Sequence, residues 1–219
     1  SSRGWRTSST CMQRSPTLYG PVVCFDEGLK QLIKEVKVPR LTQPGRPAQQ
    51  DYHYQRNGTA KLLVFIDVHR PWREVLVTER RTSTDFVLAM KKLVDEFYPD
   101  ADQIRVVLDN LNTHNPASLY KTFPAAEARR TARRIELHYT PTHASWLNMV
   151  EIEIGSLTRQ CLDRRIGEFQ TMETEVAAWV KTHNDEGATI NWLFDVDRAR
   201  VKMARHYPKP TLNQSESLR

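Results

Sequence analysis

The chain has 219 residues, 39% of them hydrophobic, with 8 glycines, which suits one α/β domain with a real core and argues against global disorder. No run of about 18 apolar residues and no signal-peptide hydrophobic stretch occurs, so we expect a soluble, cytoplasmic protein with no membrane partner. The formal net charge is +6, but half of it comes from Arg3, Arg6 and Arg14 in the acid-free segment 1–20, so it favours a nucleic-acid partner weakly.

Hydrophobic periodicity predicts strands and helices that follow an irregular or disordered segment at 1–20. Two strands are joined by the turn-like pair Arg70-Pro71, and one helix is followed directly by Pro99. The expected elements are, in chain order, a strand at 21–27, an exposed loop at 38–58, strands at 61–69 and 72–79, a helix at 82–98, a strand at 103–110, one or two helices within 116–134, a strand at 135–141, and helices at 146–162 and 169–185.

This order places strands early and helices late, which predicts an α/β fold built on one mixed five-stranded sheet flanked by helices. We expect a single catalytic domain over 21–208 and a flexible tail at 209–219. The cysteines, Cys11, Cys24 and Cys161, are far apart and form no CxxC pair, which predicts free thiols in a reducing compartment rather than a disulfide framework or a zinc ribbon.

Three acidic residues lie at the ends of predicted strands or near the start of a predicted helix. Asp26 closes the first predicted strand, Asp109 closes the fourth, and Glu151 lies one turn into the helix after the fifth. Aspartates at the carboxyl ends of neighbouring buried strands would meet, and the repulsion within a three-carboxylate cluster would be relieved by two Mg²⁺ or Mn²⁺ ions. Acids at such positions are also common as turn formers and helix-dipole partners, so position alone leaves both interpretations open.

The sequence around these acids is more specific. The motifs are VVCFDE at 22–27, VVLDNLNTH at 106–114 and HYTPTHASWLNMVEIE at 138–153, with NGTAKLLVFIDV, TERRTSTDF and SLTRQCLDRRI as further stretches. Together they resemble the catalytic domain of bacterial IS630-family insertion-sequence transposases, relatives of the Tc1/mariner elements. The resemblance implies a ribonuclease-H-like fold and a DDE triad of Asp26, Asp109 and Glu151 that holds the metal ions.

That resemblance also implies a function. Such transposases cleave DNA and transfer strands in cut-and-paste transposition, typically into TA dinucleotides, so we expect double-stranded DNA as transposon end and as target. Asp26 and Asp109 would bridge two Mg²⁺ or Mn²⁺ ions, Glu151 would hold one of them, and synapsis of two ends would suit a homodimer. Asp109 and Glu151 are further apart in sequence than is usual, and Met149 stands where many relatives have proline.

Two other functions are left open. The chain carries no helix-turn-helix region, and residues 1–20 suggest a truncated or frameshifted start. One possibility is therefore an inactive remnant that only binds DNA or a partner. The other possibility is a stand-alone structure-selective nuclease on the same fold.

Residues beside the triad have both functional and structural interpretations. Strand alternation points Glu27 to the face opposite Asp26, and Glu153 lies roughly 200° around the helix from Glu151, although a slipped alignment would exchange those two. The candidates for orienting the site or contacting substrate are Asn110, His114, Asn148 and Trp146. The candidates for contacting the DNA backbone, against a solvated helix surface, are Arg129, Arg130, Arg133, Arg134, Arg164 and Arg165.

Overall fold

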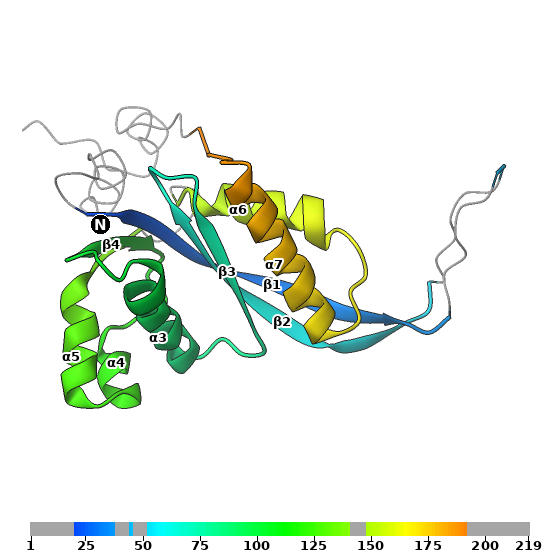
Figure 1. The fold of residues 1–219 in the computed structure, drawn as a ribbon. Coiled ribbons are helices and arrows are strands. Elements are labelled where there is room, and N and C mark those ends of the chain that lie inside the picture. Colours follow the sequence, from blue (N-terminus) through cyan, green and yellow to red (C-terminus); the bar gives the residue numbers. More distant parts are fainter. Residues whose placement is uncertain (1–19, 38–43, 46–51, 141–147, 192–219) are drawn as a thin grey trace, which may run out of the picture.

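The computed structural model describes residues 20–37, 44–45, 52–140 and 148–191 (Figure 1). Predictions for the segment 1–19, for Trp146 and for the tail 209–219 lie outside these residues. The strands are β1 (Val22–Glu35), β2 (Tyr54–Asp67), β3 (Arg73–Thr78), β4 (Ile104–Leu108) and β5 (Ile135–Tyr139). The helices are α3 (Ser83–Lys92), α4 (Ala117–Thr122), α5 (Ala125–Arg134), α6 (Val150–Leu157) and α7 (Phe169–Asp185), with π-helical segments η1 (Leu93–Phe97) and η3 (Thr158–Leu162) continuing α3 and α6.

The five strands form one mixed sheet in the order β3-β2-β1-β4-β5. The pairs β1/β2 and β2/β3 are antiparallel, whereas β1/β4 and β4/β5 are parallel. The parallel pairs are reached by helical crossovers, α3 with η1 before β4 and α4 with α5 before β5. The predicted mixed five-stranded sheet is therefore confirmed.

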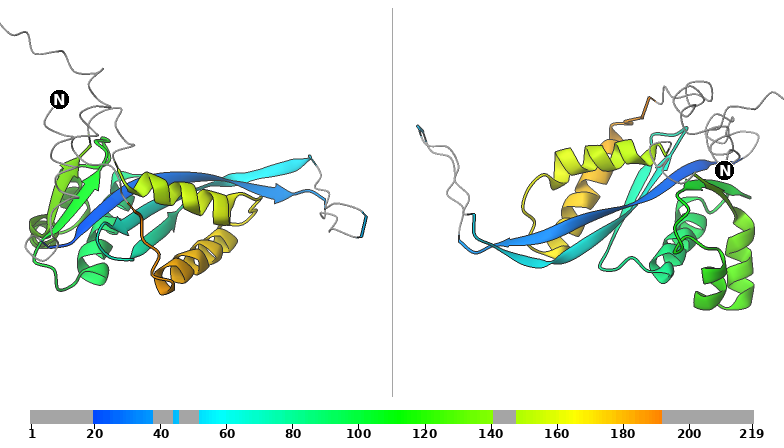
Figure 2. Two further views of the ribbon diagram at one scale, coloured as in Figure 1. Left: turned by 90° about the horizontal axis from the view of Figure 1, so that it is seen from above. Right: turned by 180° about the vertical axis from the view of Figure 1, so that it is seen from behind.

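Helices cover both faces of the sheet (Figure 2). Val22 and Cys24 of β1 belong to the core that includes residues of α6 and α7. Val23 and Phe25 belong to the second core, which includes residues of α3, α4 and α5. Because successive side chains of a strand point to opposite faces, even-numbered residues at the start of β1 face α6. No helix among the described residues is long and apolar enough to cross a bilayer.

The first two strands are longer than the sequence predicts. β1 and β2 each span 14 residues and extend together beyond the helices as a two-stranded ribbon (Figures 1 and 2). Residues 54–58, predicted as part of a loop, belong to β2, and residues 54–56 pair with the end of β1, as in the match of Glu35 with Tyr54. Asp26 consequently lies within β1 and does not close it, a correction whose cause is backbone pairing with β2.

Arg73 at the start of the edge strand β3 joins the sheet to both helices of one face. Its Nε lies 2.5 Å from Glu153 Oε1 of α6, and both side chains are buried. Its backbone N–H donates to Asn184 Oδ1 at 2.9 Å, and Asn184 Nδ2 donates to the Arg73 carbonyl at 2.9 Å. The guanidinium also donates to the Ala188 carbonyl at 2.5 Å. These contacts fix how α6, and with it Glu151, lies on the sheet.

We predict that Glu153→Ala lowers the free energy of unfolding by about 3–5 kcal/mol, because Arg73 would stay buried without its counter-charge. Urea denaturation of the metal-free chain measures this loss. Glu151→Ala is the matched control on the same helix, since Glu151 is exposed and its loss should change stability by less than about 0.5 kcal/mol. Equal stabilities of the two variants would contradict the proposed role of the Arg73–Glu153 pair.

Candidate functional site

The parallel register of β1 and β4 brings Asp26 level with Asp109. Cys24 pairs with Val107, so two residues further along each strand the two aspartates are neighbours. β4 ends at Leu108 while β1 continues, which leaves Asp109 at the carboxyl edge of β4 beside the middle of β1. The two acids belong to neighbouring strands, as expected, but only Asp109 follows a strand end.

Asp26 is a buried carboxyl with acidic neighbours. Burial raises its pKa to about 6, against the lowering effect of the Glu27 N–H, which donates to Asp26 Oδ1 at 2.7 Å. The negative charges of Asp109 and Glu151 raise this pKa further, while the charge of His114 lowers it. The charges of both other predicted acids therefore act on Asp26.

The first turn of α6 carries two acids in different surroundings. Glu151 is exposed and raises the pKa of Asp26. Glu153 is buried and ion-paired with Arg73. The slipped alignment that would give Glu153 the role of Glu151 is therefore disfavoured, because the carboxylate of Glu153 already has a buried partner.

Asn148 lies directly against Asp26. Its Nδ2 donates to the Phe25 carbonyl at 2.8 Å and to Asp26 Oδ2 at 3.4 Å. Its Oδ1 is buried and has no hydrogen-bond partner among the described residues. A buried amide oxygen without a donor is costly, so the site offers a further oxygen that a cation or a cation's water would satisfy.

His114 connects Asp109 to a residue on the other face of the sheet. Its Nδ1 lies 2.7 Å from Asp109 Oδ1, and its Nε2 lies 3.1 Å from Glu27 Oε1. Burial lowers the pKa of His114, but its hydrogen bonds to Asp109 and Glu27 outweigh this and raise the pKa to about 9. This raised pKa favours the imidazolium form of the ring at neutral pH.

The sequence did not predict the contact between His114 and Glu27. It also did not predict the contact between Arg81 Nε and Glu27 Oε2, which lie 3.1 Å apart. Strand alternation correctly placed Glu27 on the face opposite Asp26, and that was the available signal. Asn110 follows Asp109 and is exposed. Trp146 lies outside the described residues, so its role stays a prediction.

The oxygen donors fit hard divalent cations. No three Asp, Glu, His or Cys side chains of the described ranges lie close enough to hold one ion together. Asp26 nevertheless interacts with both Asp109 and Glu151.

The six arginines predicted to contact DNA differ in their surroundings. Four have partners within the chain, namely Arg130 with Asp95, Arg134 with the carbonyls of Tyr98, Pro99 and Ala101, Arg164 with Glu175, and Arg165 with Glu35. These contacts favour a structural role for the four. Arg129 and Arg133 are exposed, and their contact with DNA stays a prediction.

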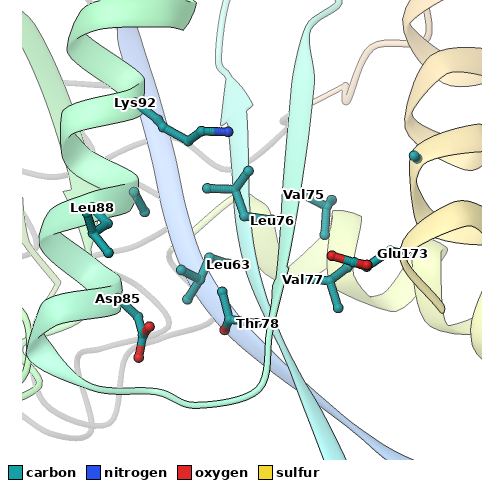
Figure 3. A pocket seen from close by; sticks show the side chains of 11 residues that line it. Leu63, Val75, Leu76, Val77, Thr78, Asp85, Leu88, Lys92 and Glu173 are labelled. Carbon is teal, nitrogen blue, oxygen red and sulfur yellow. The ribbon is translucent and has the colours of Figure 1, made fainter. Parts of the chain in front are cut away.

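A separate hollow of 410 Å³ lies beside the edge strand β3, between α3 and α7 (Figure 3). Val75, Val77 and Leu88 contribute apolar side chains, and Lys92 and Glu173 contribute opposite charges. None of the three acids lines it, so this hollow is distinct from the candidate site.

Comparison with known proteins gives a family and a fold. The family model of the DDE superfamily endonuclease matches residues 21–173, more than half of the chain. No curated protein matches. Among solved structures, the Mos1 mariner paired end complex with Mn matches with a TM-score of 0.52 and 16% identity, over 85% of this chain and 57% of that chain.

Two further Mos1 structures agree. The strand transfer complex gives a TM-score of 0.53 at 16% identity, over 84% of this chain and 55% of that one. The catalytic domain of Mos1 mariner transposase gives 0.50 at 14% identity, over 85% and 87% of the two chains. The chain thus spans little more than half of the Mos1 chains in the two complexes. The predicted ribonuclease-H-like fold is confirmed.

We predict that Asp26→Asn stabilises the metal-free chain at neutral pH by about 3 kcal/mol, because it removes a buried charge whose pKa the fold has raised. In the wild type the same gain should appear as the pH falls from about 6 towards 4, since the folded chain then binds the proton more tightly than the unfolded chain. Urea unfolding in EDTA measures both effects.

Asp109→Asn is the matched control, and it should destabilise the chain because it removes a partner of the His114 imidazolium. An Asp26→Asn variant that is less stable than the wild type in EDTA would contradict the prediction.

Proposed function

The chain belongs to the DDE superfamily endonucleases, and from this premise we propose that it is the catalytic domain of a DNA transposase, which cleaves DNA and transfers strands with divalent metal ions. One observation carries the proposal, namely that the three acids lie near one another. The β1/β4 register sets Asp26 beside Asp109, and the charge of Glu151 on α6 raises the pKa of Asp26. The Mos1 structures that share the fold are named as a paired end complex with Mn and a strand transfer complex, which supports the same chemistry here.

In this proposal Asp26, Asp109 and Glu151 would together hold the cations. Asp26 is buried in the centre of the site and interacts with both other acids. When bound, the two cations supply an activated water or 3′-hydroxyl and stabilise the leaving oxygen. Asn148 anchors α6 to the backbone of β1 and keeps an oxygen beside Asp26. His114 offsets the negative charge of Asp109.

The substrate is proposed to be double-stranded DNA, both as transposon end and as target, with TA as the preferred target step. Pairing of two ends would bring two copies of the chain together, as the name of the Mos1 paired end complex suggests by analogy. Because the chain spans 57% of that Mos1 chain, the partners and the dimer belong to the proposal. IS630 membership and a cytoplasmic place beside bacterial DNA stay predictions.

We predict metal-dependent nicking of supercoiled plasmid in Mn²⁺ or Mg²⁺, abolished by EDTA and reduced by at least about 10³-fold in Asp109→Ala, because one ligand of the cation pair is lost. Gel electrophoresis of nicked and linear products measures it. Asp102→Ala is the control, since Asp102 is an exposed acid before the opposite end of β4 and should leave nicking unchanged.

Four outcomes are distinguishable. Nicking that needs transposon-end sequences supports a transposase, whereas nicking of branched DNA without such ends supports a structure-selective nuclease. Equal nicking by wild type and Asp109→Ala points to a contaminant. A folded wild-type chain that binds DNA without nicking it would identify the inactive remnant and overturn the proposal.

A further inference from the structure

A buried charge network lies on the side of the sheet opposite Asp26. The side chain of Glu27 is 3% exposed, and its two oxygens contact His114 Nε2 at 3.1 Å and Arg81 Nε at 3.1 Å. His114 is fully buried and turns its Nδ1 to Asp109 Oδ1 at 2.7 Å. The contacts thus run without a break from Arg81, whose side chain is 49% exposed, to the proposed metal ligand Asp109.

The imidazole of His114 is held in one orientation. Its ring packs against Phe25, with centroids 5.4 Å apart, and against Phe86, with centroids 4.8 Å apart. Tyr139 donates its hydroxyl to the His114 carbonyl at 2.8 Å, which fixes the backbone. Each ring nitrogen faces a carboxylate, so a rotation of the ring would break both contacts. The ring therefore holds Oδ1 of Asp109 in place. Because the carboxylate is planar, this contact also limits where its second oxygen can lie.

The sequence explains why the network is rigid at both ends. Glu27 is the next residue after Asp26 on β1, so one strand sets the position of Asp26 on one face and of Glu27 on the other. Arg81 precedes the capping box of α3, in which Thr82 N–H donates to Asp85 Oδ2 at 2.7 Å and Asp85 N–H donates to Thr82 Oγ1 at 3.2 Å. The stretch TERRTSTDF therefore supplies both the helix start and Arg81.

We propose that Glu27 and Arg81 are positioning residues, which act through His114 to hold the Asp109 carboxylate in the orientation that binds a divalent cation. The proposal rests on the proposed function, because it takes Asp109 as a metal ligand. Outer partners that hold a ligand commonly change metal affinity by 10–100-fold when they are removed. Glu27 should have the larger effect on the position of Asp109, because its buried side chain contacts the His114 ring directly. Arg81 acts one step further away, by neutralising the second oxygen of Glu27.

The test is Mn²⁺ binding to the chain, measured by calorimetry and by the electron paramagnetic resonance signal of free Mn²⁺, together with the Mn²⁺ concentration that gives half-maximal nicking. Glu27→Ala should weaken Mn²⁺ binding by roughly 10-fold and raise that Mn²⁺ concentration in proportion. Glu27→Gln, which keeps an oxygen for His114, should restore part of the loss. Arg81→Ala should shift both values in the same direction by less, and Arg81→Lys should restore part of that.

Arg80→Ala is the matched control, because Arg80 is the exposed neighbour of Arg81 and should bind Mn²⁺ as the wild type does. A purely structural role would lower the melting temperature and leave Mn²⁺ affinity per folded molecule unchanged, and that result would overturn the proposal. Arg81 is half exposed, so its variants decide the matter even if Glu27→Ala does not fold. Wild-type chain that binds no Mn²⁺ would overturn the proposed function as well, whereas normal wild-type binding with unaffected variants overturns the positioning role alone.

Discussion

The candidate site depends on the parallel pairing of β1 and β4. In such a pair, two residues that lie the same number of positions beyond a paired couple are also neighbours. Because Cys24 pairs with Val107, Asp26 and Asp109 come together although many residues separate them in sequence. The helix α6 brings Glu151 to the same place, and the Arg73–Glu153 ion pair fixes that helix on the sheet. A change in the register of β1 would send Asp26 to the wrong face and separate the acids.

The fold treats the charges on the two faces of β1 differently. On the α6 face, burial raises the pKa of Asp26, and the negative charges of Asp109 and Glu151 raise it further. On the other face, Glu27 is equally buried, but His114 and Arg81 supply compensating positive groups. Without a cation, the negative charges around Asp26 make its ionisation costly. The carboxylate of Glu27 already has two positive partners. This contrast is the physical reason for placing the cations beside Asp26.

Much of the fold followed from the sequence, and the exceptions have clear causes. Short apolar runs marked every strand, but the ends of β1 and β2 were missed because glycine and charged residues there conceal strand alternation in an exposed ribbon. The three acids were found from their motifs, and Glu27 was placed on the correct face by alternation. Its contact with His114 was not predicted, because it depends on the loop after β4 returning beneath β1, which no local pattern encodes.

The most direct test of the account is a crystal structure of the chain soaked with Mn²⁺, with the ions located by anomalous scattering. The account predicts two peaks roughly 3.5–4 Å apart, within bonding distance of Asp26, Asp109 and Glu151. A single ion bound elsewhere, or Mn²⁺ held by Glu153 with the Arg73 pair broken, would contradict it.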